Sequence, residues 1–155
     1  MNTEEATFAA GCFWHVQLEF SETPGVLSTV AGYAGGKVEN PSYEQVHTGR
    51  TGHVEAVKLE YDKGKISYDK LLEKFFEMHD PTTVDRQGPD TGSQYNSVIF
   101  YHTKEQEEKA RKYKKNLIDQ GIKVVTRIEK AGKFYRAEEY HQDYLKKTGQ
   151  RVCPI

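Results

Sequence analysis

Two side chains in this sequence have the chemistry of a reactive pair, the thiol of Cys12 and the carboxyl of Glu55. Cys12 follows a short apolar stretch and Gly11, and the residues after it have the apolar spacing of a helix. A thiol at the start of a helix lies near free N–H groups and the positive end of the helix dipole, which favour the thiolate. This placement favours a nucleophile over the alternative, a buried structural cysteine.

Glu55 lies in a predicted strand, residues 54–61, in which side chains alternate between the two faces. It shares one face with Val57, Leu59 and Tyr61, so we expect its carboxyl to point toward the core. Burial disfavours the charged form of a carboxyl, which can then hold a proton near neutral pH and donate it. The residues leave an alternative open, in which Glu55 lies at the strand end, in solvent or beside a cation.

Two long loops, residues 32–52 and 81–96, carry further polar groups, which are Tyr43, Tyr95 and Asp90. Long loops inside a compact domain carry function more often than they serve as filler. Two phenols, two carboxyls and a thiol around one sheet would form a proton-donating pocket. Each tyrosine taken alone is typical of surface packing.

Three classes of function remain open from these residues: a thiol redox enzyme, a cysteine acyl-transfer enzyme and a binding module. Acyl transfer requires a histidine base, for which His15 and His53 are available. A reaction that consumes a proton requires an acid, which Glu55 would supply. Phe13 and Trp14 fit either the core or the wall of an apolar pocket, and the pattern favours the core.

Composition excludes several other classes. The chain has 155 residues, 36% of them hydrophobic and 29% charged, so we expect a single globular domain over residues 1–155. A formal net charge of −1 gives no basic surface for nucleic acid or lipid. The two cysteines cannot form a disulfide scaffold, and the histidines lack metal-ligand spacing. We therefore expect no metal and no cofactor.

The start of the chain raises a question of targeting, because residues 8–12 superficially resemble a bacterial lipoprotein cleavage site. Residues 1–7 include Glu4 and Glu5, with no basic residue and no apolar run, which argues against a signal peptide. No segment has the length and hydrophobicity of a membrane span. We expect a cytosolic protein without a membrane partner.

Hydrophobic spacing and capping signals predict two split β-α-β halves, and hence an α+β two-layer sandwich of the ferredoxin-like kind with a mixed sheet and long functional loops. The predicted strands cover residues 7–10, 26–33, 54–61, 97–101 and 123–130. The predicted helices cover residues 13–20, 67–78, 103–121 and 137–147. The cluster of Glu138, Glu139, His141 and Asp143 is interpreted as a solvated face of the last helix.

Beyond this pattern, Gly11-Cys12-Phe13-Trp14 resembles the signature of A-type peptide methionine sulfoxide reductases. The resemblance continues in the order of the family through GYAGG (32–36), NPSYEQV (40–46), TGHVEAV (51–57), FFEMHDPT (75–82), RQGPDTGSQY (86–95) and AEEYHQDYL (137–145). Enzymes of this type repair one epimer of methionine sulfoxide. The resemblance therefore covers nearly the whole chain.

The resemblance implies a role for each candidate residue. Cys12 attacks the sulfoxide sulfur and becomes a sulfenic acid, while Glu55 protonates the sulfoxide oxygen. Tyr43 and Tyr95 hydrogen-bond that oxygen, and Asp90 supports the network. The aromatic pair at positions 13 and 14, Phe13 and Trp14, holds the substrate methyl group, which favours the S epimer.

The resemblance also implies how the thiol is regenerated. Cys153 is the candidate resolving cysteine, which forms a disulfide with Cys12, and thioredoxin is the expected reductant. Substrates are methionine sulfoxide residues in proteins or the free amino acid. The chain departs from the family pattern at three positions: many relatives have glycine in place of His15, cysteine in place of His47 and arginine in place of Asn96.

Overall fold

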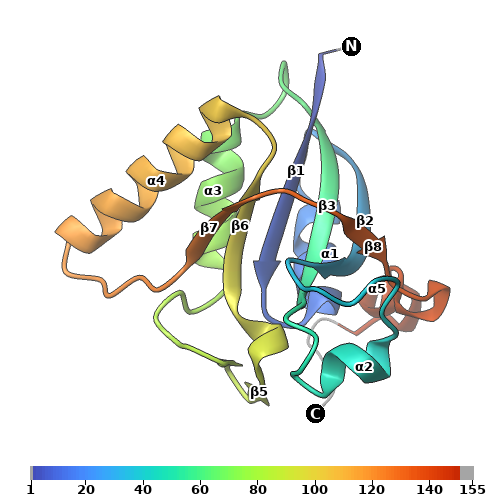
Figure 1. Cartoon of the computed structure of the whole chain (residues 1–155). Coiled ribbons are helices and arrows are strands. Elements are labelled where there is room, and N and C mark those ends of the chain that lie inside the picture. The colour runs from blue at the N-terminus through green and yellow to red at the C-terminus, as the bar shows by residue number, and fades with distance from the viewer. Residues whose placement is uncertain (1, 151–155) are drawn as a thin grey trace.

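In the computed structural model, which describes residues 2–150, six strands form one mixed sheet in the order β7-β6-β1-β3-β2-β8 (Figure 1). The strands are β1 (Thr3–Ala10), β2 (Val26–Ala34), β3 (Val54–Asp62), β6 (Ser97–Tyr101), β7 (Arg127–Lys130) and β8 (Phe134–Arg136). The short strands β4 (Arg86–Gln87) and β5 (Asp90–Thr91) form a separate hairpin.

The middle of the sheet has the ferredoxin-like arrangement that the sequence predicts. Strands β6, β1, β3 and β2 are neighbours in that order, and each pair is antiparallel. Helix α1 (Phe13–Ser21) joins β1 to β2 across β3, and α3 (Tyr68–Glu77) lies between β3 and β6, which flank β1. Strand β7 pairs parallel with β6, so the sheet is mixed. The predicted α+β class is confirmed.

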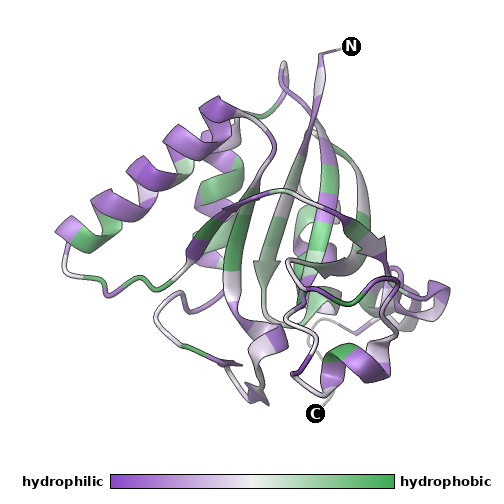
Figure 2. Ribbon diagram, viewed as in Figure 1, coloured by the Kyte–Doolittle hydropathy of each residue, from purple (hydrophilic) through white to green (hydrophobic). Residues whose placement is uncertain are grey.

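The main core lies between the sheet and its helices. Phe8 of β1 packs against Phe20 of α1 and Phe75 of α3, with ring centroids 5.1 and 5.2 Å apart. Helix α4 (Lys104–Asp119) adds Ala110 to the same core, and Figure 2 shows that the rest of this helix is mostly hydrophilic. These contacts fix α1, and with it the residue that precedes it.

The opposite face of the sheet carries a smaller apolar cluster, which includes Val54, Ala56 and Phe100. Ala131 and Phe134 pack on this cluster from the connection between β7 and β8. Figure 1 shows this connection crossing the sheet from one edge to the other. The chain thereby reaches β2 and delivers its last described residues beside α1.

The predicted alternation of β3 is confirmed, because Val57, Leu59 and Tyr61 belong to the main core, whereas Val54 and Ala56 belong to the cluster on the opposite face. Glu55 is buried as well. The predicted helix over residues 137–147 is wrong. That segment forms a 3-10 turn, η2 (Glu139–His141), and a short helix, α5 (Tyr144–Thr148). Between them the buried Gln142 side chain hydrogen-bonds the N–H and carbonyl of Ala31, which holds the segment against β2 in a non-helical conformation.

Several short elements escape the sequence prediction: α2 (Tyr43–His47), the hairpin strands β4 and β5, the 3-10 turn η1 (Ser93–Tyr95) and β8. Each is too short for a helical or strand period to be visible. Among residues 2–150, no helix combines the length and the apolar character that crossing a membrane would require. The cytosolic location stays a prediction.

Candidate active site

The sheet topology brings the predicted site residues to one end of the molecule. Because β1 is antiparallel to β3 and β6, its last residues meet their first ones, and Ala10 pairs with Ser97. Cys12 follows β1 after a turn, Glu55 is the second residue of β3, and Tyr95 lies two residues before the start of β6. Figure 1 shows α2 and the β4–β5 hairpin at this same end.

Cys12 is the N-cap residue of the nine-residue helix α1, and its carbonyl accepts a hydrogen bond from the Val16 N–H. The turn into the helix uses Gly11 at a φ of +92°, a conformation that side chains other than glycine rarely adopt. The side chain of Gln87 packs directly over Gly11. Cys12 is partly exposed, so its thiol lies at a helix N-terminus that solutes can reach.

Glu55 is 2% exposed, and one of its carboxyl oxygens accepts a hydrogen bond from the Phe13 N–H at 3.1 Å. Phe13 is the first residue of α1, so this carboxyl lies directly beside the residue that carries the thiol. The hydrogen bond also satisfies one of the free N–H groups at the helix start. The predicted buried carboxyl is confirmed, and its alternative in solvent is excluded.

Tyr43 and Tyr95 both lie in this group and hold their phenol protons tightly. Burial, followed by electrostatic interactions with Glu55 and Cys12, raises the pKa of Tyr43 to about 12, although a hydrogen bond with Tyr95 offsets part of this. Burial also raises the pKa of Tyr95, with Glu55, Tyr43 and Asp90 contributing. Both phenols are therefore hydrogen-bond donors at neutral pH.

Asp90 reaches the group from β5. Burial raises the pKa of its carboxyl, and the nearby His47 works in the opposite direction. The His47 ring lies 5.2 Å from the ring of Tyr43 and meets the Tyr95 ring edge-on at 6.4 Å. Asp90 and His47 thus lie around the two phenols rather than far from the site.

Phe13 and Trp14 differ in their surroundings. Phe13 is buried, with its ring 5.7 Å from Tyr33 and 5.2 Å from His141. Trp14 is only partly buried, stacks on Tyr144 at 3.8 Å, and donates from its indole N–H to His141 Nδ1 at 3.0 Å. The predicted core position is confirmed for Phe13, while Trp14 packs at the margin of the core and is held by His141 and Tyr144.

Two residues that the sequence prediction assigned to a solvated helix face contact the site instead. His141 is 2% exposed, packs on Tyr43 with ring centroids 4.5 Å apart, and accepts the Trp14 hydrogen bond. The carboxylate of Glu138 binds Tyr33 and Tyr43. The sequence signal that could have placed Glu138 and His141 at the site is the segment AEEYHQDYL (137–145), which resembles the family and contains both residues.

One of the two candidate bases for acyl transfer, His53, is occupied elsewhere. The Gly36 N–H donates to His53 Nδ1 at 3.0 Å, and His53 Nε2 lies 2.7 Å from the Val38 carbonyl. Both ring nitrogens therefore hold the glycine-rich turn, and His53 is a structural residue. Cys153, the candidate resolving cysteine, lies outside the described residues.

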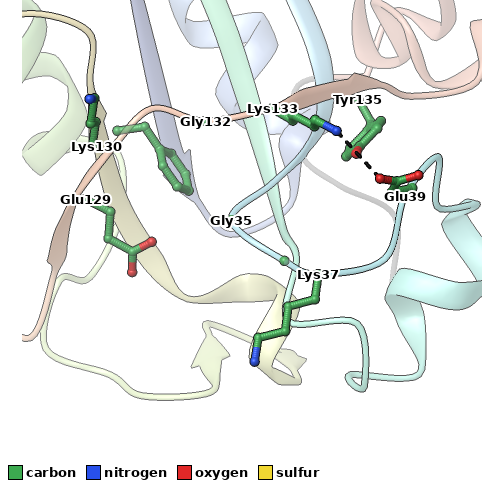
Figure 3. Close-up of a pocket in the computed structure, with 10 residues that line it drawn as sticks. Gly35, Lys37, Glu39, Glu129, Lys130, Gly132, Lys133 and Tyr135 are labelled. Atoms are coloured by element: carbon green, nitrogen blue, oxygen red, sulfur yellow. Dashed lines mark ion pairs between the residues drawn. The ribbon is translucent and has the colours of Figure 1, made fainter.

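A separate pocket of about 360 Å³ lies between the turn at Gly35 and the connection at Gly132 (Figure 3). Charged side chains of both signs line it, and Lys133 forms an ion pair with Glu39 at 3.6 Å. Among the described residues around this pocket, none belongs to the predicted site. The pocket is therefore distinct from the group around Cys12.

Comparisons with known proteins agree with this geometry. The family model described as peptide methionine sulfoxide reductase matches residues 4–155. The peptide methionine sulfoxide reductase MsrA of Methanoculleus marisnigri is 56% identical over 154 residues, which cover 97% of this chain and 93% of that protein.

Comparison with solved structures also gives similarity to proteins of this kind. Reduced Mxr1 from Saccharomyces cerevisiae superposes with a TM-score of 0.92 at 34% identity, over 98% of this chain and 89% of the other. Mxr1 in complex with Trx2 gives a TM-score of 0.67 at 25% identity, over 99% and 88%. The chain therefore belongs to the peptide methionine sulfoxide reductase family and is an oxidoreductase of that type.

Proposed function

We propose that this protein reduces the S epimer of methionine sulfoxide, free or in proteins, to methionine through a sulfenic acid on Cys12. The observation that carries the proposal is the hydrogen bond from the Phe13 N–H to Glu55, which holds a carboxyl beside the thiol-bearing residue. Sulfoxide reduction needs a nucleophile for the sulfur and a proton for the oxygen, and this arrangement offers both.

In the proposed first step, the sulfur of Cys12 attacks and bonds to the sulfur of the sulfoxide, while Glu55 protonates the sulfoxide oxygen. The protonated oxygen then moves from the substrate sulfur to the Cys12 sulfur: the sulfur–oxygen bond of the substrate and the new sulfur–sulfur bond break, and a bond between the oxygen and the Cys12 sulfur forms, which gives the sulfenic acid. Methionine leaves with the electron pair, so its sulfur is reduced by two electrons and the cysteine sulfur is oxidised by two. In sum, a thiol and a sulfoxide become a sulfenic acid and a thioether.

Two subsites would set the epimer. Tyr43 and Tyr95 carry phenol protons at neutral pH, so they can hydrogen-bond the sulfoxide oxygen, with Asp90 behind them. Phe13 and Trp14 would hold the methyl group. Cys12, the two phenols and the aromatic pair would fix the direction of attack, the position of the oxygen and the position of the methyl group. Only one configuration at the substrate sulfur fits all three, and the resemblance to the family assigns it to the S epimer.

We further propose that Cys153 resolves the sulfenic acid by forming a disulfide with Cys12 and releasing water. A dithiol protein such as thioredoxin would then reduce this disulfide. The structural similarity to Mxr1 solved in complex with Trx2 supports a partner of that kind. The described residues do not include Cys153, so its role rests on the sequence.

The test is to incubate the protein separately with each epimer of methionine sulfoxide and dithiothreitol, and to quantify methionine. The S epimer should be consumed and the R epimer should persist. Cys12→Ser should remove turnover because an alcohol cannot accept the oxygen as a sulfenic acid. Cys153→Ser is the matched control and should stay active, because dithiothreitol replaces the resolving thiol. Turnover by Cys12→Ser would refute the proposed mechanism.

A further inference from the structure

Glu138 connects three segments of the chain through one carboxylate. Its Oε1 accepts a hydrogen bond from the Tyr33 hydroxyl at 2.9 Å, and its Oε2 accepts one from the Tyr43 N–H at 3.0 Å. Tyr33 belongs to β2 and Tyr43 begins α2, whereas Glu138 follows β8. Each carboxylate oxygen therefore holds a different element.

The N–H of Tyr43 depends on this contact. As the first residue of α2, Tyr43 has no acceptor for its N–H within the helix. The cap residue Ser42 forms two reciprocal hydrogen bonds with Gln45. The Ser42 hydroxyl accepts from the Gln45 N–H, and the Ser42 N–H donates to the Gln45 side-chain oxygen. Helix α2 has only five residues and cannot be stable alone, so its position depends on external anchors.

The charge on Glu138 suits this role. Burial raises the pKa of its carboxyl, but hydrogen bonds from Tyr43, from its own backbone and from Tyr33 outweigh burial and lower the pKa overall. The carboxylate is therefore ionised at neutral pH. An anionic acceptor forms stronger hydrogen bonds than a neutral one, and negative charge at a helix N-terminus is favourable.

The segment that carries Glu138 is itself held in place. The Ala137 N–H donates to the Ala31 carbonyl at 2.9 Å, and the buried Gln142 side chain binds both backbone groups of Ala31. From this segment the His141 ring packs on the Tyr43 ring. Tyr43 is thus held at its backbone by Glu138 and at its ring by His141.

We propose that Glu138 is a positioning residue, which holds α2 so that the Tyr43 phenol stays beside Tyr95 and the thiol of Cys12. The inference rests on the proposed function, in which the Tyr43 phenol hydrogen-bonds the sulfoxide oxygen. In this role Glu138 acts on the reaction through Tyr43, whose N–H it accepts. Its effect must therefore disappear when the Tyr43 phenol is absent, and a merely structural role would not behave in this way.

The experiment is a double-mutant cycle on Glu138→Gln and Tyr43→Phe, measured as the single-turnover rate of S-sulfoxide reduction. The amide of glutamine removes the charge of Glu138. Its oxygen can accept from the Tyr43 N–H only if its NH₂ group faces the Tyr33 hydroxyl, which must then accept a hydrogen bond instead of donating one. We expect Glu138→Gln to slow the first step by about 10- to 100-fold, the scale expected for a misplaced catalytic group. In the Tyr43→Phe background the same change should slow it less than about threefold.

Glu139→Gln is the matched control, because the neighbouring Glu139 is exposed and pairs only with the exposed Arg136 among the described ion pairs. This control should keep the rate of the wild type. Thermal melting of every variant checks the fold, and Glu138→Asp, which keeps the charge but is too short to reach both donors, replaces Glu138→Gln in the cycle if that variant does not fold.

The outcomes separate the two proposals. If the wild type does not reduce the S epimer, the proposed function fails. If it does, and the Glu138 change costs the same factor with and without the Tyr43 phenol, only the positioning role is overturned. A Glu138→Gln variant as fast as Glu139→Gln overturns it as well.

Discussion

Replacing Gly11 with alanine would place a methyl group where the chain turns toward the thiol. Gly11 has a φ of +92°, and a Cβ built there would lie 2.7 Å from Gln87 Cγ and 3.0 Å from Gln87 Cβ. The positive φ costs alanine about 1–2 kcal/mol. The overlap adds about 1–3 kcal/mol, as overpacking does in a filled site. We expect the free energy of unfolding to fall by the sum.

Gln87 cannot move aside without consequence. Its amide exchanges two hydrogen bonds with the backbone of Asp80, at 2.8 and 2.7 Å, and its strand pairs it with Asp90. Displacing Gln87 therefore displaces the hairpin that carries Asp90. For this reason Gly11→Ala should also lower the S-sulfoxide reduction rate, by about 10-fold or more.

Gly121→Ala supplies the control, because Gly121 has nearly the same φ, +93°, and nothing within 4 Å of its built Cβ. The free energy of unfolding of Gly121→Ala should fall only by the backbone contribution of about 1–2 kcal/mol, and its activity should be unchanged. Urea unfolding measures both variants. If Gly11→Ala loses no more stability than Gly121→Ala and stays fully active, the argument from the Gln87 contact is wrong.

Three further predictions concern the proton donor, a buried histidine and the second cysteine. Glu55→Gln should slow single turnover by about 10²–10⁴-fold, because an amide has no proton to give; a rate equal to the wild type would assign the donor elsewhere. Burial lowers the pKa of His79 from 6.5 to about 4, so the unfolded chain binds the proton first and the free energy of unfolding should fall by about 3 kcal/mol between pH 6.5 and pH 4. His79→Gln should flatten this dependence in urea unfolding at several pH values, and an unchanged slope would contradict the assignment. Addition of one equivalent of methionine sulfoxide without reductant should remove both free thiols from the wild type, whereas Cys153→Ser should retain an extra oxygen in its intact mass; loss of the Cys12 thiol alone in the wild type would exclude Cys153 as the resolving residue.

The sequence predicts those parts of the site that depend on local pattern. The alternation of β3 places Glu55 on the buried face, because a strand offers only two faces. The junction of an apolar strand with a helix places Cys12 at the helix start. The positions of Glu55 and Cys12 can be predicted because the strand and helix spacings of apolar residues beside them extend over several residues.

The parts that escape prediction depend on contacts between distant residues. The helical assignment for residues 137–147 fails because Gln142 binds Ala31, 111 residues earlier, and local propensity carries no information about such a bond. Glu138 and His141 then face the site instead of solvent. Helix α2 has one local signal, the capping box of Ser42 and Gln45, but its five residues are too few for a helical period, and its first N–H is held by the distant Glu138.

The connection that crosses the sheet between β7 and β8 has a consequence for how the chain reaches its native state. Trp14 meets His141 across 127 residues, and Tyr43 meets Glu138 across 95. Contacts of such long range form slowly, because the entropy of closing the intervening chain is lost before they stabilise anything. During synthesis Cys12 and Trp14 emerge early, but His141 and Tyr144, which pack on Trp14, emerge at least 127 residues later. In a nascent chain, the helix start at Cys12 therefore lacks its contacts with residues 141–144 until the β7–β8 connection has crossed the sheet.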